Sequence, residues 1–342
     1  MRISHRSSAR LGSAAARRRV TRCGALAGAV LLGVAACGGG ASSGGSDVAV
    51  GMVLKTLSNP YFGAMKQAAQ KAAKAKGVDL TVKAGKYDGD VSTQISAIET
   101  FTTRGVDAIV VVPNVSSGLN RALKQAKQQG IAVIAADTAV KPKSLSSSFV
   151  ATDNLKAGKF NGKWAQAAMG DKKPVVALLE GTPSSSVNRD RMNGFLQGFG
   201  MEKSEADVDL ITHGDQAKAQ TAMENALAKN PNINLVWTIN EPAALGAAQA
   251  IKERGLTDEI TVVSMDGSCR GIRAVKAGKI DTDVMQFPSK MSAKSIDLSI
   301  KAAQGKDIPS RVDTGEVLVT KNPQKGVPSK SIDYGMKHCW GK

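Results

Sequence analysis

The chain has 342 residues, enough for two domains of ordinary size, and its 42% hydrophobic and 22% charged residues exclude a disordered protein. A net charge of +17 is typical of proteins that bind nucleic acid, but much of it lies in the first 36 residues, which are arginine-rich and contain no acidic residue. The remaining lysines are spread along predicted helices such as "AMKQAAQKAAKAKG", the pattern of a solvated face, so we predict no nucleic-acid partner.

The N-terminus is typical of a secretory signal. The apolar run "GALAGAVLLGVAA" at residues 24–36 is too short to remain in a bilayer as a spanning helix. It ends in "VAAC" before "GGGASSGGS", the pattern of a lipobox in which a peptidase cuts ahead of a lipid-modified cysteine. We expect a signal peptide at 1–36, lipid on Cys37 and a flexible Gly/Ser tether over 37–46. The alternative is an ordinary secretory signal with an incidental cysteine, and "RRRV" leaves Sec and twin-arginine export both open.

This N-terminus predicts an extracytoplasmic protein anchored to the outer face of the cytoplasmic membrane by Cys37. In that oxidising setting the two other cysteines of the mature chain, Cys269 and Cys339, are candidate disulfide partners. The alternative is two unpaired cysteines, one of them buried. Because the chain has no CxxC motif and its mature part holds only His213 and His338 as histidines, we predict no metal site and no cofactor.

From residue 47 onward, short apolar runs alternate with amphipathic segments. The first of them, "VAVGMVL", is an apolar run typical of a buried strand, and "GAMKQAAQKAAKAKG" has helical periodicity and ends at a glycine. Strands that alternate with helices predict right-handed βαβ units and a parallel sheet covered on both faces. The expected strands are 48–54, 79–85, 107–113 and 131–137, and the expected helices are 63–77, 91–105 and 117–130.

The alternation restarts near residue 175, which predicts a second α/β lobe. Residues 110–137 and 235–266 follow the same order of strand, polar residue, helix, glycine, strand and aspartate, so the two halves correspond. The expected strands are 175–181, 207–213, 235–240, 259–266 and 281–286, and the expected helices are 189–200, 219–230, 241–255 and 269–279.

Polar side chains stand where several of these strands end, and open α/β sheets bind ligands at the carboxyl ends of their strands. The set mixes carboxylates, carboxamides and one guanidinium, which suits a sugar. A hydroxyl donates to a carboxylate while it accepts from an amide or a guanidinium. The candidates for a cleft between the lobes are Asn59, Tyr61, Phe62, Asp137, Arg191, Asn240, Asp266 and Gln286.

Two scarce aromatic residues, Tyr61 and Phe62, follow the turn-forming pair Asn59–Pro60 in "TLSNPYF". We expect them on an exposed loop ahead of a helix that begins near residue 63. The C–H face of a sugar ring is apolar and lies flat on aromatic rings. One ring would therefore contact the ligand, while the other holds the loop to its domain.

Taken in order, these motifs resemble the periplasmic-type sugar-binding proteins of ABC transporters, in the ribose-binding branch. The resemblance covers about residues 48–320 and rests on "TLSNPYF", "GVDAIVVVP", "IAVIAAD", "ATDN", "RDRMNGF", "TINEPAALGA", "VVSMDG" and "DTDVMQFP". It implies a type I periplasmic binding protein fold, in which two doubly wound parallel-sheet lobes are joined by a three-crossover hinge. It also implies a monomer that delivers a sugar or polyol to an ABC permease and its ATPase.

By the same resemblance, the lobes comprise 47–152 plus 287–313 and 153–286 plus 314–342. The crossovers lie near 151–153, 286–288 and 311–314, and the lobes close on the ligand. Asn59 would hydrogen-bond the sugar, Tyr61 and Phe62 would flank its ring, and Asp137 would bind a hydroxyl pair. The second lobe would contribute Arg191, Asn240, Asp266 and Gln286.

Two departures from the ribose-binder pattern argue against ribose itself. Thr138 stands where ribose binders carry an arginine after the first aspartate, and we expect it in the pocket. His213, with Gly214, stands where they carry an aromatic residue of the second lobe, so His213 is a further candidate ligand contact. A different pentose, a hexose or a polyol would suit the roomier pocket that these residues leave.

Three other functions compete with this interpretation. A secreted hydrolase could use the serines and Asp190 of "GTPSSSVNRD" with His213 as a base, but the chain has no GxSxG motif and no recognisable nucleophile arrangement. The effector lobe of a transcription repressor would need an N-terminal helix-turn-helix, where this chain has a signal and a tether. A receptor that presents its ligand to a membrane sensor would use the same closed form, and the sequence does not separate it from an importer.

Overall fold

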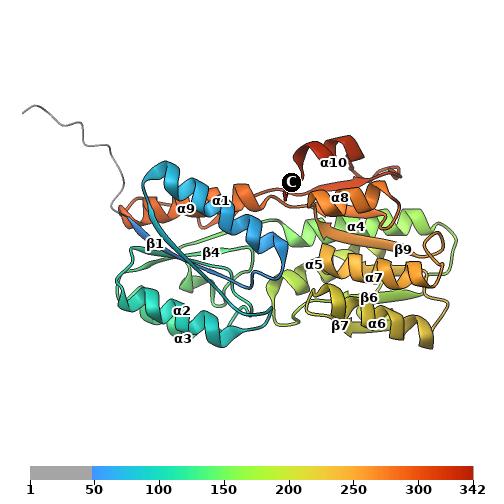
Figure 1. Ribbon diagram of the computed structural model, residues 1–342, viewed down its shortest axis with the longest axis horizontal. Coiled ribbons are helices and arrows are strands. Elements are labelled where there is room, and N and C mark those ends of the chain that lie inside the picture. The colour runs from blue at the N-terminus through green and yellow to red at the C-terminus, as the bar shows by residue number, and fades with distance from the viewer. Residues whose placement is uncertain (1–47, 342) are drawn as a thin grey trace, which may run out of the picture. The chain divides into compact units, whose positions relative to one another are not determined.

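A computed structural model describes residues 48–341 of the chain as two α/β lobes, each built on a six-stranded sheet (Figure 1). The expected signal peptide, Cys37 and the Gly/Ser tether lie outside the described residues. Within the described part, no helix is both long and apolar enough to span a bilayer. The fold class predicted from the sequence is confirmed, with one antiparallel strand added at an edge of the second sheet.

The first lobe is a parallel sheet between two pairs of helices. Its strand order is β11-β5-β4-β3-β1-β2. Successive residues point to opposite faces, so Met52 packs with α1 and α9, while Val53 packs with α2 and α3. The strands are β1 (Ala49–Leu54), β2 (Asp79–Ala84), β3 (Ala108–Val111), β4 (Ala132–Ala136), β5 (Ser148–Ala151) and β11 (Arg311–Asp313). The helices are α1 (Pro60–Lys76), α2 (Val91–Thr103), α3 (Asn120–Gln128) and α9 (Pro288–Ala303), with a 3-10 turn at Lys143–Leu145.

The second lobe repeats this plan with strand order β12-β10-β9-β8-β6-β7, in which only β12 runs antiparallel, to β10. Helices α4 and α5 pack together, as do α6 and α7, while α10 lies on α8. The strands are β6 (Val176–Glu180), β7 (Val208–Ile211), β8 (Leu235–Thr238), β9 (Thr261–Asp266), β10 (Thr282–Met285) and β12 (Val317–Thr320). The helices are α4 (Asn154–Met169), α5 (Ser186–Phe199), α6 (Gln216–Lys229), α7 (Glu241–Glu253), α8 (Cys269–Lys276) and α10 (Ile332–His338), with a 3-10 turn at Lys203–Glu205.

The chain passes between the lobes three times: from β5 to α4, from β10 to α9, and from β11 to β12. One buried polar side chain from each crossing meets at a common point. The Thr152 hydroxyl lies 3.3 Å from Gln286 Oε1, to which it donates, and 3.4 Å from the Thr314 hydroxyl. These contacts join the three crossovers side by side, so the lobes share one hinge region.

Helix α1 corrects the expectation for "TLSNPYF". The helix begins at Pro60, three residues earlier than expected, because Asn59 is its N-cap and accepts a hydrogen bond from the Tyr61 amide at 2.9 Å. Proline at the first helical position completes this start, since its missing N–H would be unpaired there. Tyr61 and Phe62 therefore lie in the first turn of α1 and not on an exposed loop, and their side chains are only 2% and 4% exposed.

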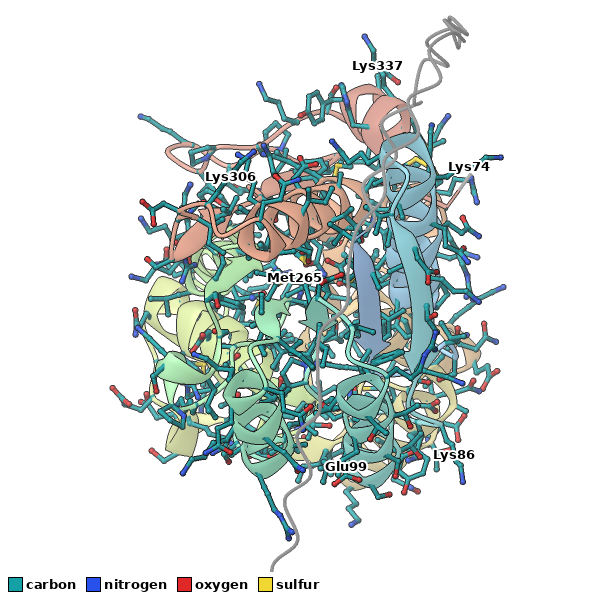
Figure 2. The ribbon with its side chains drawn as sticks, turned by 90° about the vertical axis from the view of Figure 1, so that its left-hand side faces the viewer. Lys74, Lys86, Glu99, Met265, Lys306 and Lys337 are labelled. Carbon is teal, nitrogen blue, oxygen red and sulfur yellow. A yellow bond between two sulfur atoms is a disulfide. The ribbon has the colours of Figure 1, made fainter. Side chains whose placement is uncertain are left out.

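Apart from the buried Lys55, the lysines of the described residues lie at the surface. Lys74 on α1, Lys306 beyond α9 and Lys337 on α10 point outward from different parts of the protein, whereas Met265 in β9 lies inside (Figure 2). This arrangement matches the solvated faces that the sequence suggested.

Candidate ligand-binding site

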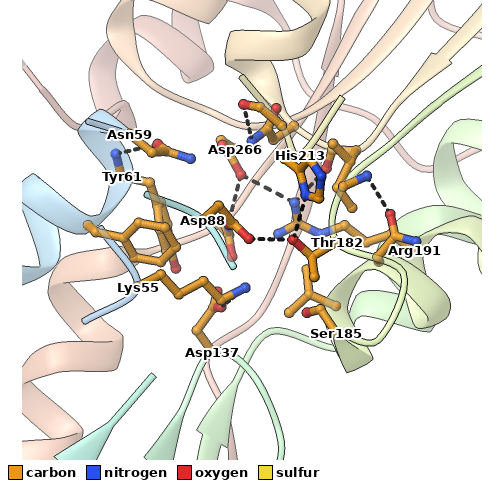
Figure 3. A pocket seen from close by; sticks show the side chains of 18 residues that line it. Lys55, Asn59, Tyr61, Asp88, Asp137, Thr182, Ser185, Arg191, His213 and Asp266 are labelled. Carbon is orange, nitrogen blue, oxygen red and sulfur yellow. Dashed lines mark hydrogen bonds and ion pairs between the residues drawn. The ribbon is translucent and has the colours of Figure 1, made fainter. Parts of the chain in front are cut away.

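A polar cavity lies between the lobes, at the carboxyl ends of their strands (Figure 3). Its lining side chains enclose about 420 Å³ of empty space, part of it open to solvent. The first lobe contributes Lys55, Asn59, Tyr61, Phe62, Asp88 and Asp137. The second lobe contributes Gly181, Thr182, Ser185, Val187, Asn188, Arg191, His213, Gly214, Ile239, Asn240 and Asp266, and the second crossover contributes Gln286.

The carboxylate of Asp266, the last residue of β9, is held by two side chains from other parts of the chain. Its Oδ1 accepts a hydrogen bond of 2.7 Å from Gln286 Nε2 and lies 3.4 Å from Arg191. Burial raises the pKa of Asp266 to about 7. The Arg191 charge opposes this shift, and the carboxyl of Glu241 adds to it. This carboxyl therefore exchanges its proton near neutral pH, which few aspartates do.

Two further buried carboxyls hold the turn after Asp266. Glu241 accepts a hydrogen bond of 2.9 Å from the Ser268 amide, and Asp283 accepts one of 3.2 Å from the Gly267 amide. Burial raises the pKa of both carboxyls above the ordinary value. The turn that carries Asp266 into α8 is thus fixed by side chains from α7 and β10.

Arg191 enters the cavity from α5 and is only 3% exposed. Its guanidinium donates to Asn154 Oδ1 at 2.8 Å and to the Ile239 carbonyl at 2.7 Å, besides facing Asp266. Helix α5 lies close against α4, and only glycine at position 158 permits this approach. A Cβ on Gly158 would stand 2.1 Å from the Arg191 carbonyl oxygen, which is too close. Glycine at this point of α4 therefore sets the depth at which Arg191 reaches the cavity.

The first lobe places Asp137, directly after β4, opposite this network. Its Oδ2 accepts a hydrogen bond of 2.9 Å from the Thr138 hydroxyl and lies 3.9 Å from Lys55 Nζ. Lys55 follows β1, is 5% exposed, and places its ammonium 5.8 Å from the centre of the Phe62 ring. The cavity therefore has one buried cation on each side, Lys55 from the first lobe and Arg191 from the second.

The two rings of α1 have different surroundings. Tyr61 packs edge-on against Phe62 at 5.4 Å between ring centres and against Trp340 at 5.6 Å, and its hydroxyl lies 3.7 Å from Met291 Sδ. Burial raises the pKa of Tyr61, so the phenol stays neutral. Phe62 instead lies under the Lys55 ammonium. Tyr61 is thus more deeply packed into the core, and Phe62 is the ring associated with the polar groups of the cavity.

A short hydrogen-bonded chain crosses from one lobe to the other. The Thr182 hydroxyl, after β6, donates to Asp88 Oδ1 of the first lobe at 2.6 Å and lies 3.2 Å from His213 Nδ1. Asn240 caps α7 by accepting from the Ala243 amide at 3.0 Å and donates to the Gly214 carbonyl at 3.1 Å. These hydrogen bonds hold together the part of the second lobe that lines the cavity, and the bond from Thr182 to Asp88 connects it to the first lobe.

The backbone is strained at three positions around this cavity. Among the described non-glycine residues, positive φ angles occur at Asp137 (59°), His213 (55°) and Asp266 (140°), and all three residues line the cavity. Such conformations cost free energy and persist where the surrounding structure imposes them, most often at functional sites. The strain therefore marks this cavity independently of its side-chain chemistry.

The structure brings together nearly all of the residues that the sequence nominated. Thr138 is the exception, because it lies fully buried behind Asp137 and supports that carboxylate from outside the cavity. Sequence reasoning missed Lys55, Asp88 and Thr182, which follow β1, β2 and β6. The rule that ligands bind at the carboxyl ends of parallel strands would have found Lys55, directly after β1, and Thr182, two residues after β6, whereas Asp88 lies four residues beyond β2.

The cavity chemistry suits a small molecule with several hydroxyl groups. Carboxylates at Asp137 and Asp266 accept from hydroxyls, while Lys55 and Arg191 donate to them. Within residues 48–341, no group of histidine, cysteine, aspartate and glutamate side chains is arranged to hold a metal ion.

Two α/β lobes that enclose a polar cavity and share three crossovers define the type I periplasmic binding protein fold. The chain belongs to the periplasmic binding protein family, since residues 50–307 match the family described as "Periplasmic binding protein domain". It is 29% identical to the ribose import binding protein of Salmonella typhimurium, over 80% of this chain and 90% of that protein. It is 30% identical to the xylitol-binding protein of Mycolicibacterium smegmatis, over 92% of this chain and 87% of that protein.

Solved structures show the same relationship. A periplasmic solute-binding protein of an ABC transporter from Actinobacillus succinogenes, with bound D-allose, has a TM-score of 0.72 and 30% sequence identity. That comparison covers 80% of this chain and 97% of the other. A solute-binding protein from Mycobacterium smegmatis with bound glycerol has a TM-score of 0.75 and 27% identity, over 83% of this chain and all of the other (100%).

Proposed function

We propose that this chain is the extracytoplasmic substrate-binding component of an ABC importer and binds a monosaccharide or polyol between its lobes. The observation that carries the proposal is that buried carboxylates and cations of both lobes face one cavity, with Asp137 and Lys55 on one side and Asp266 and Arg191 on the other. A ligand with several hydroxyls can bridge such groups, which rewards closure of the lobes. The named relatives support this class, since they bind ribose, D-allose, xylitol or glycerol.

The proposed ligand contacts come from both lobes and the hinge. We add Lys55 to the residues nominated from sequence because it supplies the first lobe with a cation next to Asp137. In the ribose-binder pattern, this cation is an arginine at the position of Thr138. Lys55 extends from the end of β1 and not from the position after Asp137, so the cation of this lobe differs from that of the ribose-binder pattern, and we expect a different pentose, a hexose or a polyol as the ligand. The full set is Lys55, Asn59, Phe62, Asp137, Arg191, His213, Asn240, Asp266 and Gln286, with Tyr61 supporting Phe62.

A thermal-shift screen followed by calorimetric titration tests the ligand class. The panel contains D-allose, D-ribose, xylitol, myo-inositol and glycerol, with glucose and galactose for comparison. A ligand that binds only the folded state raises the melting temperature, so at least one sugar or polyol should raise it and titrate with one site per chain. Recovery of the ligand unchanged would support a binding protein and not a hydrolase. If no member of the panel binds, the proposed ligand class is wrong.

The proposed anchor is a lipid on Cys37, which would hold a monomer beside its permease and ATPase. Replacing Cys37 by alanine should move the protein from the membrane fraction to the soluble fraction without changing ligand affinity, because the tether separates the anchor from the lobes. Cys23→Ala serves as the matched control, since that residue lies within the expected signal peptide. A Cys37→Ala protein that has lost its signal peptide and still sediments with membranes contradicts the lipid anchor.

A further inference from the structure

The segment after β12 returns from the second lobe to the hinge region. It runs through α10 and then pairs with the start of α8, where Cys339 forms a disulfide with Cys269. The Cys269 amide donates to the Trp340 carbonyl at 2.8 Å, next to a backbone bridge between Ser268 and Trp340. Both connections attach the segment within three residues of Asp266, on the turn that carries this cavity residue into α8.

The Trp340 side chain reaches both lobes. Its Nε1 donates to the Asp266 carbonyl at 2.9 Å, and its ring meets the Tyr61 ring edge-on at 5.6 Å. Tyr61 is part of the first lobe's core, against which Trp340 packs as a partly buried residue. Trp340 is therefore fixed to the second lobe through its backbone and its indole N–H, while its ring packs with the first lobe.

This contact lies beside the second crossover. Trp340 shares a shallow, mostly apolar groove with Ser289 and Ala293 of α9 and with Ala64 and Ala68 of α1. The disulfide it adjoins packs against Met285 and Phe287, the residues on either side of Gln286. The lobes thus have a link next to the hinge in addition to the three crossovers, and this link passes through a side chain.

We propose that Trp340 is a positioning residue for the ligand cavity, which holds Asp266 and the first turn of α1 in register across the two lobes. This inference rests on the proposed function, because it concerns the affinity of that same cavity. The contact forms when the lobes are arranged as described here, so it lowers the free energy of this arrangement relative to more open ones. Since apparent affinity scales with the fraction of protein in the binding-competent arrangement, the contact raises affinity without touching the ligand.

Three variants separate the two halves of the contact. Trp340→Ala removes both the ring contact and the hydrogen bond, whereas Trp340→Phe keeps a ring for Tyr61 and loses the bond to Asp266. Tyr334→Ala is the matched control. It truncates an aromatic residue of the same segment, on α10, whose ring lies against His338 at 4.4 Å between ring centres.

We expect Trp340→Ala to weaken binding of the best sugar or polyol of the panel about tenfold, the loss of an aromatic contact and a hydrogen bond together. Trp340→Phe should have an intermediate effect, and Tyr334→Ala should leave affinity within about twofold of wild type. In small-angle scattering without ligand, Trp340→Ala should have a larger radius of gyration than wild type and the control. Replacing Cys269 and Cys339 together by serine should reproduce the effect in part, because the backbone of Trp340 loses its covalent attachment.

Fluorescence shows whether the surroundings of Trp340 change when the ligand binds. Of the three tryptophans, Trp164 and Trp237 are 2% and 0% exposed within the second lobe's core, and Trp340 alone contacts the first lobe. Ligand binding should therefore shift the emission of wild type, and Trp340→Phe should abolish most of that shift.

If Trp340→Ala and Trp340→Phe lower the melting temperature but keep the affinity and the unliganded radius of gyration of wild type, the segment only stabilises the fold and the proposal is wrong. Where Trp340→Ala does not fold, Trp340→Phe and the double serine variant decide. If wild type binds no member of the panel, the proposed function fails. The scattering comparison of unliganded proteins still decides the role of Trp340.

Discussion

The two aspartates at corresponding strand ends, Asp137 of the first lobe and Asp266 of the second, differ in how they are held. Asp137 is supported by its chain neighbour Thr138 and by Lys55 at 3.9 Å. Asp266 is held by Gln286 and Arg191 through its carboxylate and by Trp340 through its carbonyl. The two sides of the cavity thus have the same acceptor chemistry but different stiffness.

This difference indicates a division of labour between the lobes. The second lobe presents an acceptor fixed by buried groups from several elements, so it can select hydroxyl stereochemistry. In the first lobe, Asp137 has fewer partners and Lys55 carries its charge on a long aliphatic stem, so we expect this side to adjust more readily as the lobes close. Changes on the second-lobe side should therefore affect both stability and affinity, and changes on the first-lobe side mainly affinity.

The largest expected effect is that of Arg191→Met. The substitution leaves Asn154 Oδ1 and the Ile239 carbonyl without their donor in a buried site. It also removes the positive charge that faces Asp266, whose carboxylate then keeps only Gln286 as a side-chain donor. We expect the free energy of unfolding to fall by about 3 kcal/mol. Ligand affinity should fall about 100-fold, as measured by calorimetric titration.

Arg189→Met is the matched control for this prediction. Arg189 lies two residues earlier on α5, and its ion pair is with its exposed neighbour Asp190. Arg189→Met should leave the free energy of unfolding and the ligand affinity close to those of wild type, because exposed ion pairs contribute little. Equal effects of the two substitutions would mean that the buried groups around Arg191 and Asp266 do not hold the ligand.

The pH dependence of binding tests the same side of the cavity. Burial raises the pKa of Asp266 to about 7, against the opposing charge of Arg191 and with a contribution from Glu241. A ligand hydroxyl donates to the ionised carboxylate, so affinity should rise with pH through about 7 and be about tenfold higher at pH 8 than at pH 6. Asp266→Asn should bind more weakly and with little dependence on pH.

Stability should change in the opposite direction. The pKa of Asp266 is higher in the folded protein than its ordinary value of 3.8, so the folded state binds the extra proton between that value and about 7. The contribution to the free energy of unfolding is greatest at low pH and is lost as pH rises through this window. The difference in melting temperature between unliganded wild type and Asp266→Asn should therefore change across the window. A constant difference would show that Asp266 does not titrate there.

Much of this comparison could be predicted from the sequence, because strand ends are local features. Asp137 and Asp266 follow apolar runs that parallel sheets require, and Asn59 precedes a proline that marks a helix start. The stiffness of the second side could not be predicted, since it depends on contacts between residues far apart in the chain. Trp340 and Asp266 are one example, and Arg191 and Asn154 are another.

The two rings of α1 sharpen the contrast between packing and ligand contact. Phe62 lies beneath the Lys55 ammonium at the cavity, so Phe62→Ala should weaken most sugars alike, by about fivefold, because a ring face reads C–H surface and not hydroxyl stereochemistry. Tyr61 is held by Trp340 and Met291 in the core, so Tyr61→Ala should lower the melting temperature more than Phe62→Ala does, and should weaken binding only through the lost contact with Trp340. Melting curves and titrations on both variants test this assignment. The reverse pattern would make Tyr61 the ligand ring.

The smallest expected effect concerns Thr182, whose hydroxyl donates to Asp88 across the cleft and contacts His213. Thr182→Val keeps the shape of the side chain and removes this hydrogen bond between the lobes. A single neutral hydroxyl contributes about 1 kcal/mol net, and Asp88 regains water when the bond is lost, so affinity should fall only about threefold. Thr182→Ser keeps the hydroxyl and should match wild type in the same titration. A loss as large as that of Arg191→Met would mean that closure depends on this contact at the cleft edge more than on the buried groups around Asp266.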